Sequence, residues 1–344
     1  MEKVLVTGAT GRLGANIVNL LIKRGYEVRA FVMKDDPELC KLKNLNCEIF
    51  YGNFLDFNSI EDAVKGMDRV LHIGAVMYRP PSMSELTYWN LNVTGTFVLT
   101  RACIKHNVKR LLYASTDATY DAKSWIHLPI NENHPQRPTS LYGVHKLCGE
   151  QIVLEAMRET GLPVTITRFA SIMINDEILN FFTIRYILAV CRGTMSKAYT
   201  NINPNKIPDT HIPVEKAMKD PMQLCIPRGR DFRSWRFHIC DIRDTMEGIL
   251  LAMTKDEAVG EVFNIGYYRA FTWEEIIKYI AEKSNQSYVD LCLDAFWEFE
   301  LSCEKAQRLL DFSPKYDYKT MIDDAFRYRA GEDLGLIQGQ SYFK

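Results

Sequence analysis

The chain has 344 residues, of which 47% are hydrophobic and 25% are charged, and its formal net charge at pH 7 is −1. This composition is ordinary for a globular protein, and the small net charge gives no general attraction to nucleic acid or to anionic membranes. No apolar run approaches the roughly 18 residues of a membrane span, and no cleavable signal precedes the first strand, so we expect a cytoplasmic protein.

The nine cysteines predict neither a disulfide framework nor a metal site. Their number is odd and none belongs to a CxxC pair, the spacing of many zinc sites. We therefore expect reduced thiols that act mostly as small hydrophobic residues, and no bound metal.

The first half of the chain alternates two sequence patterns. Short β-branched runs occupy residues 3–7, 27–32, 47–51, 69–74, 110–115 and 164–169, and helix-period segments occupy 13–24, about 36–44, 59–66, 86–107 and 140–160. Alternating strands and helices predict an α/β fold with a doubly wound parallel sheet of the Rossmann type. The strands are apolar runs, as expected where helices cover both faces of a sheet.

The pattern changes after about residue 170. The segment 171–235 is irregular and proline-rich, and later Thr272 and Glu275 have the spacing of a capping box that begins a helix. We predict a dinucleotide-binding domain over residues 1–170, to which a segment near 236–268 returns, and a smaller C-terminal substrate-binding cap built from 171–235 and 269–344.

A glycine-rich turn follows the first strand, where "VTGATGRLG" places Gly8, Gly11 and Gly14 three residues apart. A tight turn from strand to helix needs residues without Cβ, and a pyrophosphate can approach only bare backbone. The free N–H groups and the positive dipole end of the following helix then favour the phosphate. In this strand–helix frame the motif predicts dinucleotide binding, although its spacing differs from the usual GxGxxG.

The sequence gives only a weak preference between the two nicotinamide cofactors. An NAD site usually has an acid at the end of the second strand, but residues 32–33 are valine and methionine there. Lys34 and Arg12 could meet the 2′-phosphate of NADP, which favours NADP. The nearby acids Asp35 and Asp36 weaken that preference, and both cations could equally be solvated loop residues.

Tyr142 and Lys146, in "LYGVHK", lie four residues apart on a predicted helix and so share one helical face. A nearby ammonium lowers the pKa of a tyrosine from about 10, so that the phenol can take a proton from an alcohol as hydride leaves. Tyr279 and Lys283 have the same spacing, but no strand end rich in serine or threonine precedes them. We interpret that second pair as part of a surface helix.

Ser115 and Thr116 end the fifth strand, at the edge where parallel sheets bind ligands, so either hydroxyl could hold the substrate oxygen. The segments "TGATGRLG", "GNFLDF", "NVTGT", "ASTDATY", "LYGVHK" and "VFNIG" occur in the order found in one enzyme family. The chain resembles an extended short-chain dehydrogenase/reductase of the NAD-dependent epimerase/dehydratase family.

That resemblance implies roles for individual residues. Tyr142 would be the acid/base, Lys146 would also hold the nicotinamide ribose, and Thr116 falls at the position of the catalytic serine or threonine. The resemblance places these further residues at the cofactor: Thr10 and Leu13 in the glycine turn, Asn53 and Phe54 beside the adenine, Ile73, Gly74 and Ala75 in the cleft, Asn92 supporting the active-site helix, and Phe169 at the end of the sixth strand.

Departures from the family pattern bear on the substrate. Sugar-nucleotide 4,6-dehydratases carry a glutamate where this chain has Ala118, which argues against dehydration. Ser171 and Met173 replace the asparagine and the YGP-like turn that meet the diphosphate in sugar-nucleotide epimerases, and Ser234 lies near the place of a later arginine. A nucleotide-diphosphate substrate is therefore in doubt.

The sequence offers several candidate substrate contacts. "RGRDFRSWRFH" contains Arg228, Arg230, Arg233 and Arg236, whose guanidinium groups suit phosphate or carboxylate, and Trp235, which could stack on a sugar or base. The alternative is a charged turn paired with Asp231, Asp241 and Asp244. The other candidates are Tyr78, Arg79, Thr116, Asp117 and Ser171, whereas we interpret His238 as structural.

We predict an NAD(P)-dependent oxidoreductase or epimerase that acts on a secondary alcohol or ketone of a sugar-like small molecule. Two alternatives remain: an NADPH-dependent reductase of a non-sugar ketone or aldehyde, and a non-catalytic dinucleotide-sensing module. The helical segments 86–107 and 140–160 carry apolar residues on more than one face, which is compatible with a homodimer.

Overall fold

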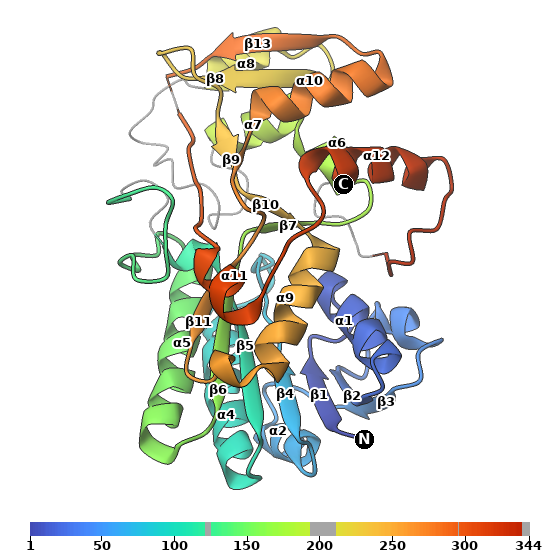
Figure 1. Cartoon of the computed structure of the whole chain (residues 1–344), viewed down its shortest axis with the longest axis vertical. Helices are drawn as coiled ribbons and strands as arrows, with labels where there is room; N and C mark the ends of the chain where they lie inside the picture. Colours follow the sequence, from blue (N-terminus) through green and yellow to red (C-terminus); the bar gives the residue numbers. More distant parts are fainter. Residues whose placement is uncertain (121–124, 193–210, 295, 339–344) are drawn as a thin grey trace.

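The computed structural model describes residues 1–120, 125–192, 211–294 and 296–338, and it has the predicted doubly wound architecture (Figure 1). Seven parallel strands form one sheet in the order β11-β6-β5-β4-β1-β2-β3. The strands of this sheet are β1 (Lys3–Thr7), β2 (Glu27–Val32), β3 (Glu48–Tyr51), β4 (Arg69–His72), β5 (Arg110–Thr116), β6 (Val164–Phe169) and β11 (Val262–Ile265).

Helices cover both faces of this sheet. One hydrophobic layer joins α1 and α9 to the strands, and a second layer joins α2, α4 and α5 to the opposite face. These helices are α1 (Arg12–Lys23), α2 (Phe57–Val64), α4 (Gly95–Lys105), α5 (Leu141–Thr160) and α9 (Ile242–Thr254). Strands covered on both faces explain why residues 110–116 are buried without exception.

The predicted helix over 86–107 corresponds to three consecutive pieces: α3 (Glu85–Trp89), a π-helical turn η2 (Asn90–Thr94) and α4. The expected helix near 36–44 is only a short 3₁₀ turn, η1 (Leu39–Leu42). Its single buried side chain is Leu42, so there is too little packing to stabilise a longer helix. Two further 3₁₀ turns are η3 (Asp117–Thr119) and η4 (Asp256–Ala258).

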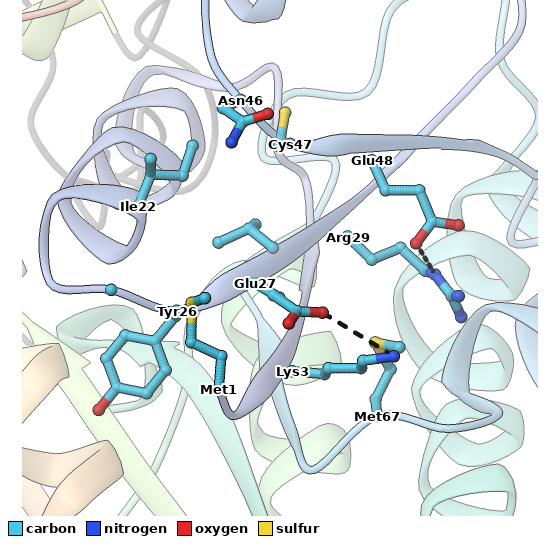
Figure 2. A pocket seen from close by; sticks show the side chains of 12 residues that line it. Met1, Lys3, Ile22, Tyr26, Glu27, Arg29, Asn46, Cys47, Glu48 and Met67 are labelled. Atoms are coloured by element: carbon cyan, nitrogen blue, oxygen red, sulfur yellow. Dashed lines mark hydrogen bonds and ion pairs between the residues drawn. The ribbon is translucent and has the colours of Figure 1, made fainter.

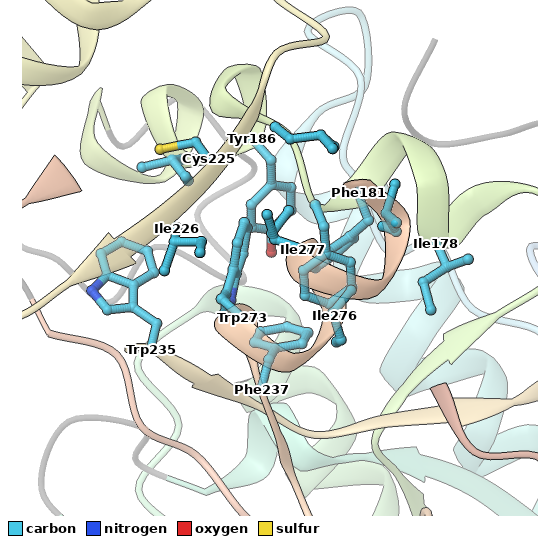
Figure 3. Packing of buried hydrophobic residues seen from close by; sticks show 14 of the residues in the cluster. Ile178, Phe181, Tyr186, Cys225, Ile226, Trp235, Phe237, Trp273, Ile276 and Ile277 are labelled. Atoms are coloured by element: carbon cyan, nitrogen blue, oxygen red, sulfur yellow. The ribbon is translucent and has the colours of Figure 1, made fainter. Parts of the chain in front are cut away.

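A second group of elements lies beyond the carboxyl ends of the strands (Figure 1). Its own hydrophobic core gathers Phe181, Tyr186, Trp235, Phe237 and Trp273 (Figure 3). The helices of this cap are α6 (Glu177–Phe181), α7 (Ile184–Arg192), α8 (His211–Ala217), α10 (Trp273–Ser284) and α12 (Tyr318–Arg329), and its strands and those leading to it are β7 (Ser171–Met173), β8 (Leu224–Arg228), β9 (Arg236–Phe237), β10 (Ile239–Asp241), β12 (Phe271–Thr272) and β13 (Tyr288–Cys292).

Local sequence explains where α10 begins. Thr272 and Glu275 form the predicted capping box: the threonine side chain accepts from the amide of Glu275, and the glutamate side chain accepts from the amide of Thr272.

One helix of the C-terminal segment lies on the sheet. α11 (Glu304–Leu310) falls in the segment predicted for the cap, yet it contacts β11 and α9. Its Ala306 and Leu310 belong to the hydrophobic layer of the sheet. α11 therefore packs on the sheet, although the sequence prediction assigns its residues to the cap.

No helix within the described ranges is long and apolar enough to cross a membrane. A hollow of about 410 Å³ lies at the amino ends of β1 to β3, between Tyr26, Arg29, Cys47 and Glu48 (Figure 2). This hollow lies at the edge opposite to the carboxyl ends of the strands, where ligands bind in such sheets.

Candidate active site

The glycine turn depends on the absence of side chains. Gly8 has φ +67°, and a Cβ on it would lie 2.5 Å from the Cα of Gly74, which follows β4. A Cβ on Gly14 would lie 2.0 Å from the carbonyl oxygen of Gly8. The turn after β1 and the exit of β4 therefore touch through backbone atoms, which brings Gly8, Gly14 and Gly74 together.

The start of α1 is suited to a phosphate. Its N-cap, Gly11, makes no side-chain cap, and no acidic residue occupies its first turn, where Leu13 lies. No carboxylate of the first turn therefore competes with a phosphate for the free amide groups and the positive dipole of this helix end. Thr10, just before, donates a hydrogen bond of 2.6 Å from Oγ1 to Oδ2 of Asp36, which ties the turn to the segment after β2.

The two cations predicted for a 2′-phosphate lie in different surroundings. The guanidinium of Arg12 donates to Oε2 of Glu177, whose side chain is 4% exposed. Burial raises the pKa of Glu177, and the charge of Arg12 opposes that rise. Lys34 is exposed to solvent on the segment after β2.

The exit of β4 is fixed by Asn92. Its Oδ1 accepts from the amide of Val76 at 2.8 Å, and its Nδ2 donates to the carbonyl of Val76 at 2.9 Å. Nδ2 also lies 3.3 Å from Nδ1 of His145 on α5. Asn92, in the π-helical turn, thus joins the segment after Ile73 and Ala75 to the helix that carries Tyr142.

Asn53 and Phe54, assigned to the adenine, have different neighbours. Asn53 is exposed, and its Oδ1 accepts from the amide of Leu55 at 2.9 Å. The ring of Phe54 packs 5.2 Å from that of Phe31 and against α4, where a Cβ on Gly95 would lie 2.6 Å from its Cδ1. Phe54 therefore contributes to the layer between sheet and helix. Phe169, at the end of β6, is buried in the opposite layer.

Two glycines bring α5 close to the end of β5. A Cβ on Gly143 would lie 2.2 Å from the carbonyl oxygen of Ala118, and a Cβ on Gly149 would lie 2.0 Å from the hydroxyl of Tyr113. Ser140 begins the helix, accepting from the amide of Gly143 at 3.0 Å. The first turn of α5 therefore lies against residues 116–118.

Lys146 is buried within this contact, with 3% of its surface exposed. Its Nζ lies 4.0 Å from the centre of the Tyr113 ring. Burial lowers the pKa of Lys146 to about 7, and the negative charge of Glu150 acts in the opposite direction. His72 is close enough for the charge of Lys146 to add to the burial that lowers the His72 pKa to about 3.

Ser115 and Thr116 point to different groups, because neighbouring side chains on a strand face opposite sides. Ser115 donates to Oε1 of buried Glu150. Thr116 accepts from the amide of Ala118 at 3.2 Å and donates to Oδ1 of Asp117 at 3.1 Å. Of the two hydroxyls, that of Thr116 lies at the start of the loop against which the Tyr142 end of α5 packs.

A group from the cap that the sequence did not single out approaches this site. Burial raises the pKa of Asp117 to about 7. Burial first, and then the charges of Tyr78 and Asp117, raise the pKa of Tyr186 on α7. Tyr186 therefore lies within electrostatic reach of Tyr78 and of Asp117. The apolar pattern of α7 predicts a core helix and gives no signal for this contact.

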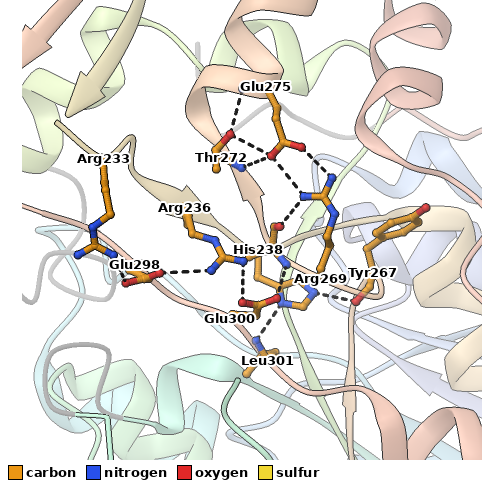
Figure 4. Close-up of polar contacts among 11 residues, drawn as sticks. Arg233, Arg236, His238, Tyr267, Arg269, Thr272, Glu275, Glu298, Glu300 and Leu301 are labelled. Atoms are coloured by element: carbon orange, nitrogen blue, oxygen red, sulfur yellow. Dashed lines mark hydrogen bonds and ion pairs between the residues drawn. The ribbon is translucent and has the colours of Figure 1, made fainter. Parts of the chain in front are cut away.

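The arginines of the predicted substrate cluster form ion pairs with carboxylates of the chain. Arg233 pairs with Asp231 at 2.6 Å, as the alternative predicted, and with Glu298 at 3.5 Å. Arg236 pairs with Glu298 at 3.3 Å and Glu300 at 2.8 Å (Figure 4). The other pairs are Arg228 with Glu274 and Asp290, and Arg230 with Asp294.

The remaining predicted substrate residues are scattered. Trp235 is 2% exposed and lies in the cap core. Arg79 donates to the carbonyl of Met83 at 2.6 Å, and Ser171 lies on β7 beside β10.

The contacts of His238 and of the Tyr279–Lys283 pair agree with the structural roles expected for them. His238 is 1% exposed, accepts from the amide of Leu301 at 2.9 Å and lies 3.0 Å from the carbonyl of Tyr267 (Figure 4). Tyr279 donates to both carboxylate oxygens of Asp323, to which Lys283 is also paired. Within the described residues, no group of three or more His, Cys, Asp or Glu side chains could hold a metal ion.

The fold and this arrangement define a nucleotide-binding enzyme class. The model of the NAD dependent epimerase/dehydratase family matches residues 4–173. Over 96% of its length the chain superposes on 98% of a short-chain dehydrogenase/reductase superfamily protein from Agrobacterium tumefaciens, solved with bound NAD, with a TM-score of 0.82 and 26% identity. Through residues 4–173 the chain belongs to the NAD-dependent epimerase/dehydratase family, of the extended short-chain dehydrogenase/reductase type.

Two curated relatives show how broad the similarity is. The chain is 36% identical over 197 residues to sterol demethylase protein B of Methylococcus capsulatus, and this match spans 56% of the chain but only 58% of that relative. It is 24% identical over 357 aligned positions to UDP-glucose 4-epimerase of Halalkalibacterium halodurans, spanning 94% of the chain and 95% of that relative. The two names differ in substrate, so similarity alone does not choose between them.

Proposed function

We propose that this chain is a nicotinamide-dependent oxidoreductase or epimerase of a secondary alcohol or its ketone, with Tyr142, Lys146 and Thr116 as its catalytic residues. The observation that carries the proposal is the contact between Gly143 and the carbonyl of Ala118, where a Cβ would lie 2.2 Å away. This contact brings the Tyr142 end of α5 against the loop that begins with Thr116, and Lys146 lies buried one turn along the helix.

In the proposed mechanism each residue has a separate task. Thr116 orients the substrate oxygen through its hydroxyl. Tyr142 accepts the alcohol proton during oxidation and returns it during reduction. The Lys146 ammonium stabilises the phenolate form of Tyr142, and it would also hold the cofactor ribose. When bound, the nicotinamide supplies the hydride acceptor or donor, and the glycine turn with the start of α1 would hold its pyrophosphate.

For the cofactor we propose NAD rather than the NADP that the sequence weakly favours. Asp36 is held beside the glycine turn by Thr10, at 2.6 Å, where a carboxylate can accept from a ribose hydroxyl and repel a 2′-phosphate. Arg12 is engaged by Glu177. The Agrobacterium structure, at 26% identity, is also described with NAD.

For the substrate we propose a sugar-like compound, and the long alignment with a UDP-glucose 4-epimerase supports this. A non-sugar alcohol or ketone is the second candidate. It is supported by the ion pairs of Arg233 and Arg236, by aromatic Tyr186 within electrostatic reach of Asp117, and by the relative named sterol demethylase protein B. Ala118, which replaces the glutamate of dehydratases, speaks against dehydration.

Two experiments test the proposal. Mass spectrometry of the denatured protein identifies any dinucleotide purified with it: stoichiometric NAD supports an epimerase that recycles its own hydride, and an empty site supports an enzyme that exchanges cofactor.

The second experiment measures turnover with UDP-glucose and with neutral cyclic alcohols. Tyr142→Phe should lower it by roughly 10²–10⁴-fold while NAD still binds. Equal turnover would remove Tyr142 from the mechanism, and NAD binding without turnover on any alcohol would favour the sensing module.

A homodimer through α4 and α5 remains a prediction. Phe97 on α4 is 44% exposed and Leu141 at the start of α5 is 43% exposed. Light scattering of the purified protein measures the mass directly and would distinguish a dimer from a monomer.

A further inference from the structure

A buried polar network extends from the active-site helix through the sheet. Its centre is Glu150 on α5, which lies one turn after Lys146 and is 0% exposed. Its carboxylate accepts from Gln136 Nε2 at 2.7 Å and from Ser115 Oγ. Arg168 on β6 adds two donors, Nε at 3.0 Å and Nη2 at 2.7 Å. A carboxylate that accepts from four donors is fixed in place.

The network continues beyond Arg168 and fixes that arginine in turn. Nη1 of Arg168 donates to the Tyr120 hydroxyl at 2.6 Å, and this hydroxyl donates to Oδ1 of Asn264 on β11 at 2.9 Å. The backbone amide of Asn264 donates to Oε1 of Glu132 at 2.8 Å. Glu150 is therefore held by β5, β6 and the loop after β5, with β11 behind them.

Lys146 needs a nearby negative charge if its amine is to stay protonated in this buried position. Its Nζ lies over the Tyr113 ring at 4.0 Å, and it makes no ion pair with a carboxylate among the described residues. Burial favours the neutral amine, and the negative charge of Glu150 favours the ammonium. A neutral Lys146 would not stabilise a phenolate on Tyr142.

The other groups around the pair do not replace Glu150. His72 is hydrogen-bonded to Thr7 and Thr96 and its low pKa keeps it neutral at working pH. The groups in electrostatic contact with Lys146, Glu150 or Arg168 are His72 on β4, Tyr113 on β5, and Tyr120 and Glu132 on the loop after β5. Tyr142 and Cys148 on α5 are in electrostatic contact with Tyr113.

We propose that Glu150 is a positioning residue of this active site: its buried carboxylate keeps the Lys146 ammonium charged, and through Lys146 it sets the pH at which Tyr142 accepts a proton. The inference rests on the proposed function, since it concerns the same catalytic pair. It assigns Ser115 a supporting role, as a donor to Glu150, in place of contact with substrate.

The test is a tyrosinate titration by ultraviolet absorbance of the folded protein saturated with NAD. The curve for Tyr142 is the difference between the protein and its Tyr142→Phe variant, and the same difference is measured in a Glu150→Gln background. Without the carboxylate, Lys146 loses its proton at lower pH, so the Tyr142 midpoint should rise by at least about 0.5 pH unit.

Glu155→Gln is the matched control, because Glu155 lies on the same helix but is partly exposed and pairs with Arg101 at 3.4 Å. Its Tyr142 midpoint should not move. If Arg168, left unpaired, prevents folding of Glu150→Gln, the variant Glu150→Gln/Arg168→Met removes both buried charges. It should shift the midpoint in the same direction by a smaller amount.

A midpoint that stays within error in the folded Glu150 variants would overturn the inference. This outcome is separate from failure of the proposed function. The titration needs no substrate, so it still measures the effect of Glu150 if no alcohol is turned over.

Discussion

Gly143 lies against Ala118 so closely that a Cβ on the glycine would be 2.2 Å from the alanine carbonyl oxygen and 2.9 Å from Cβ of Pro138. Both neighbours belong to segments that connect β5 to α5. The absence of one side chain therefore sets the distance between the helix that carries Tyr142 and the strand end that carries Thr116.

Gly143→Ala should separate these elements. Overpacking of this kind costs about 1–3 kcal/mol of unfolding free energy, and a displacement of about 1 Å can lower turnover about 10²-fold. Urea denaturation and the turnover assay measure the two effects. Leu141→Ala, at an exposed neighbouring position, should change the unfolding free energy by no more than about 0.5 kcal/mol. Unchanged turnover in Gly143→Ala would show that the close contact does not position Tyr142.

Short-range motifs could be predicted because their physical cause is local. The glycine turn requires positive φ at Gly8, the capping box joins residues three apart, and the Tyr142–Lys146 spacing follows from the helical repeat. The alternating strands and helices likewise predicted the parallel sheet.

Contacts between segments far apart in the sequence could not be predicted from local patterns. The predicted partners of the arginine cluster were nearby aspartates, but Arg236 pairs with Glu298 and Glu300, 62 and 64 residues away. Arg12 and Glu177 are 165 residues apart. Nothing in the local pattern around either residue indicates the partner, because tertiary packing brings them together. Tyr186 comes within electrostatic reach of Asp117 for the same reason.

Asp36→Ser should change cofactor preference. Removing the carboxylate beside the glycine turn takes away a ribose acceptor and the repulsion of a 2′-phosphate, so the ratio of the NADP Kd to the NAD Kd should fall at least about tenfold. Isothermal titration calorimetry with both dinucleotides measures the ratio. Lys34→Ala is the matched comparison. If Lys34 binds a 2′-phosphate, this substitution should weaken the binding of NADP and leave the binding of NAD unchanged. A Lys34→Ala effect larger than that of Asp36→Ser would restore the preference for NADP.

Arg12→Met should destabilise the protein strongly. It leaves the Glu177 carboxyl buried, with 4% of its side chain exposed, and without its cation. Breaking a buried pair by removing one partner costs about 3–5 kcal/mol. Arg24→Met is the matched control, since Arg24 and Glu247 are 49% and 44% exposed and such a pair contributes about 0–1 kcal/mol. Equal losses of unfolding free energy in the two variants would contradict the prediction.

Lys146→Met should stabilise the fold while it abolishes turnover. Burial lowers the pKa of Lys146 from 10.5 to about 7 in the folded protein. Below pH 7 the amine is charged in both the folded and unfolded states, and the folded state bears the whole cost of burying that charge.

Between pH 7 and 10.5 the folded state releases the Lys146 proton that the unfolded chain still binds, so the contribution of Lys146 to the unfolding free energy of the unmodified protein rises with pH across this window. The gain in unfolding free energy from Lys146→Met should therefore be larger at pH 6 than at pH 9, as measured by urea denaturation at both values. Lys109→Met, at an exposed position on the surface, should show no such gain. An equal gain at both pH values for Lys146→Met would mean that Lys146 titrates outside this window, and that its charge needs no support from Glu150 near neutral pH.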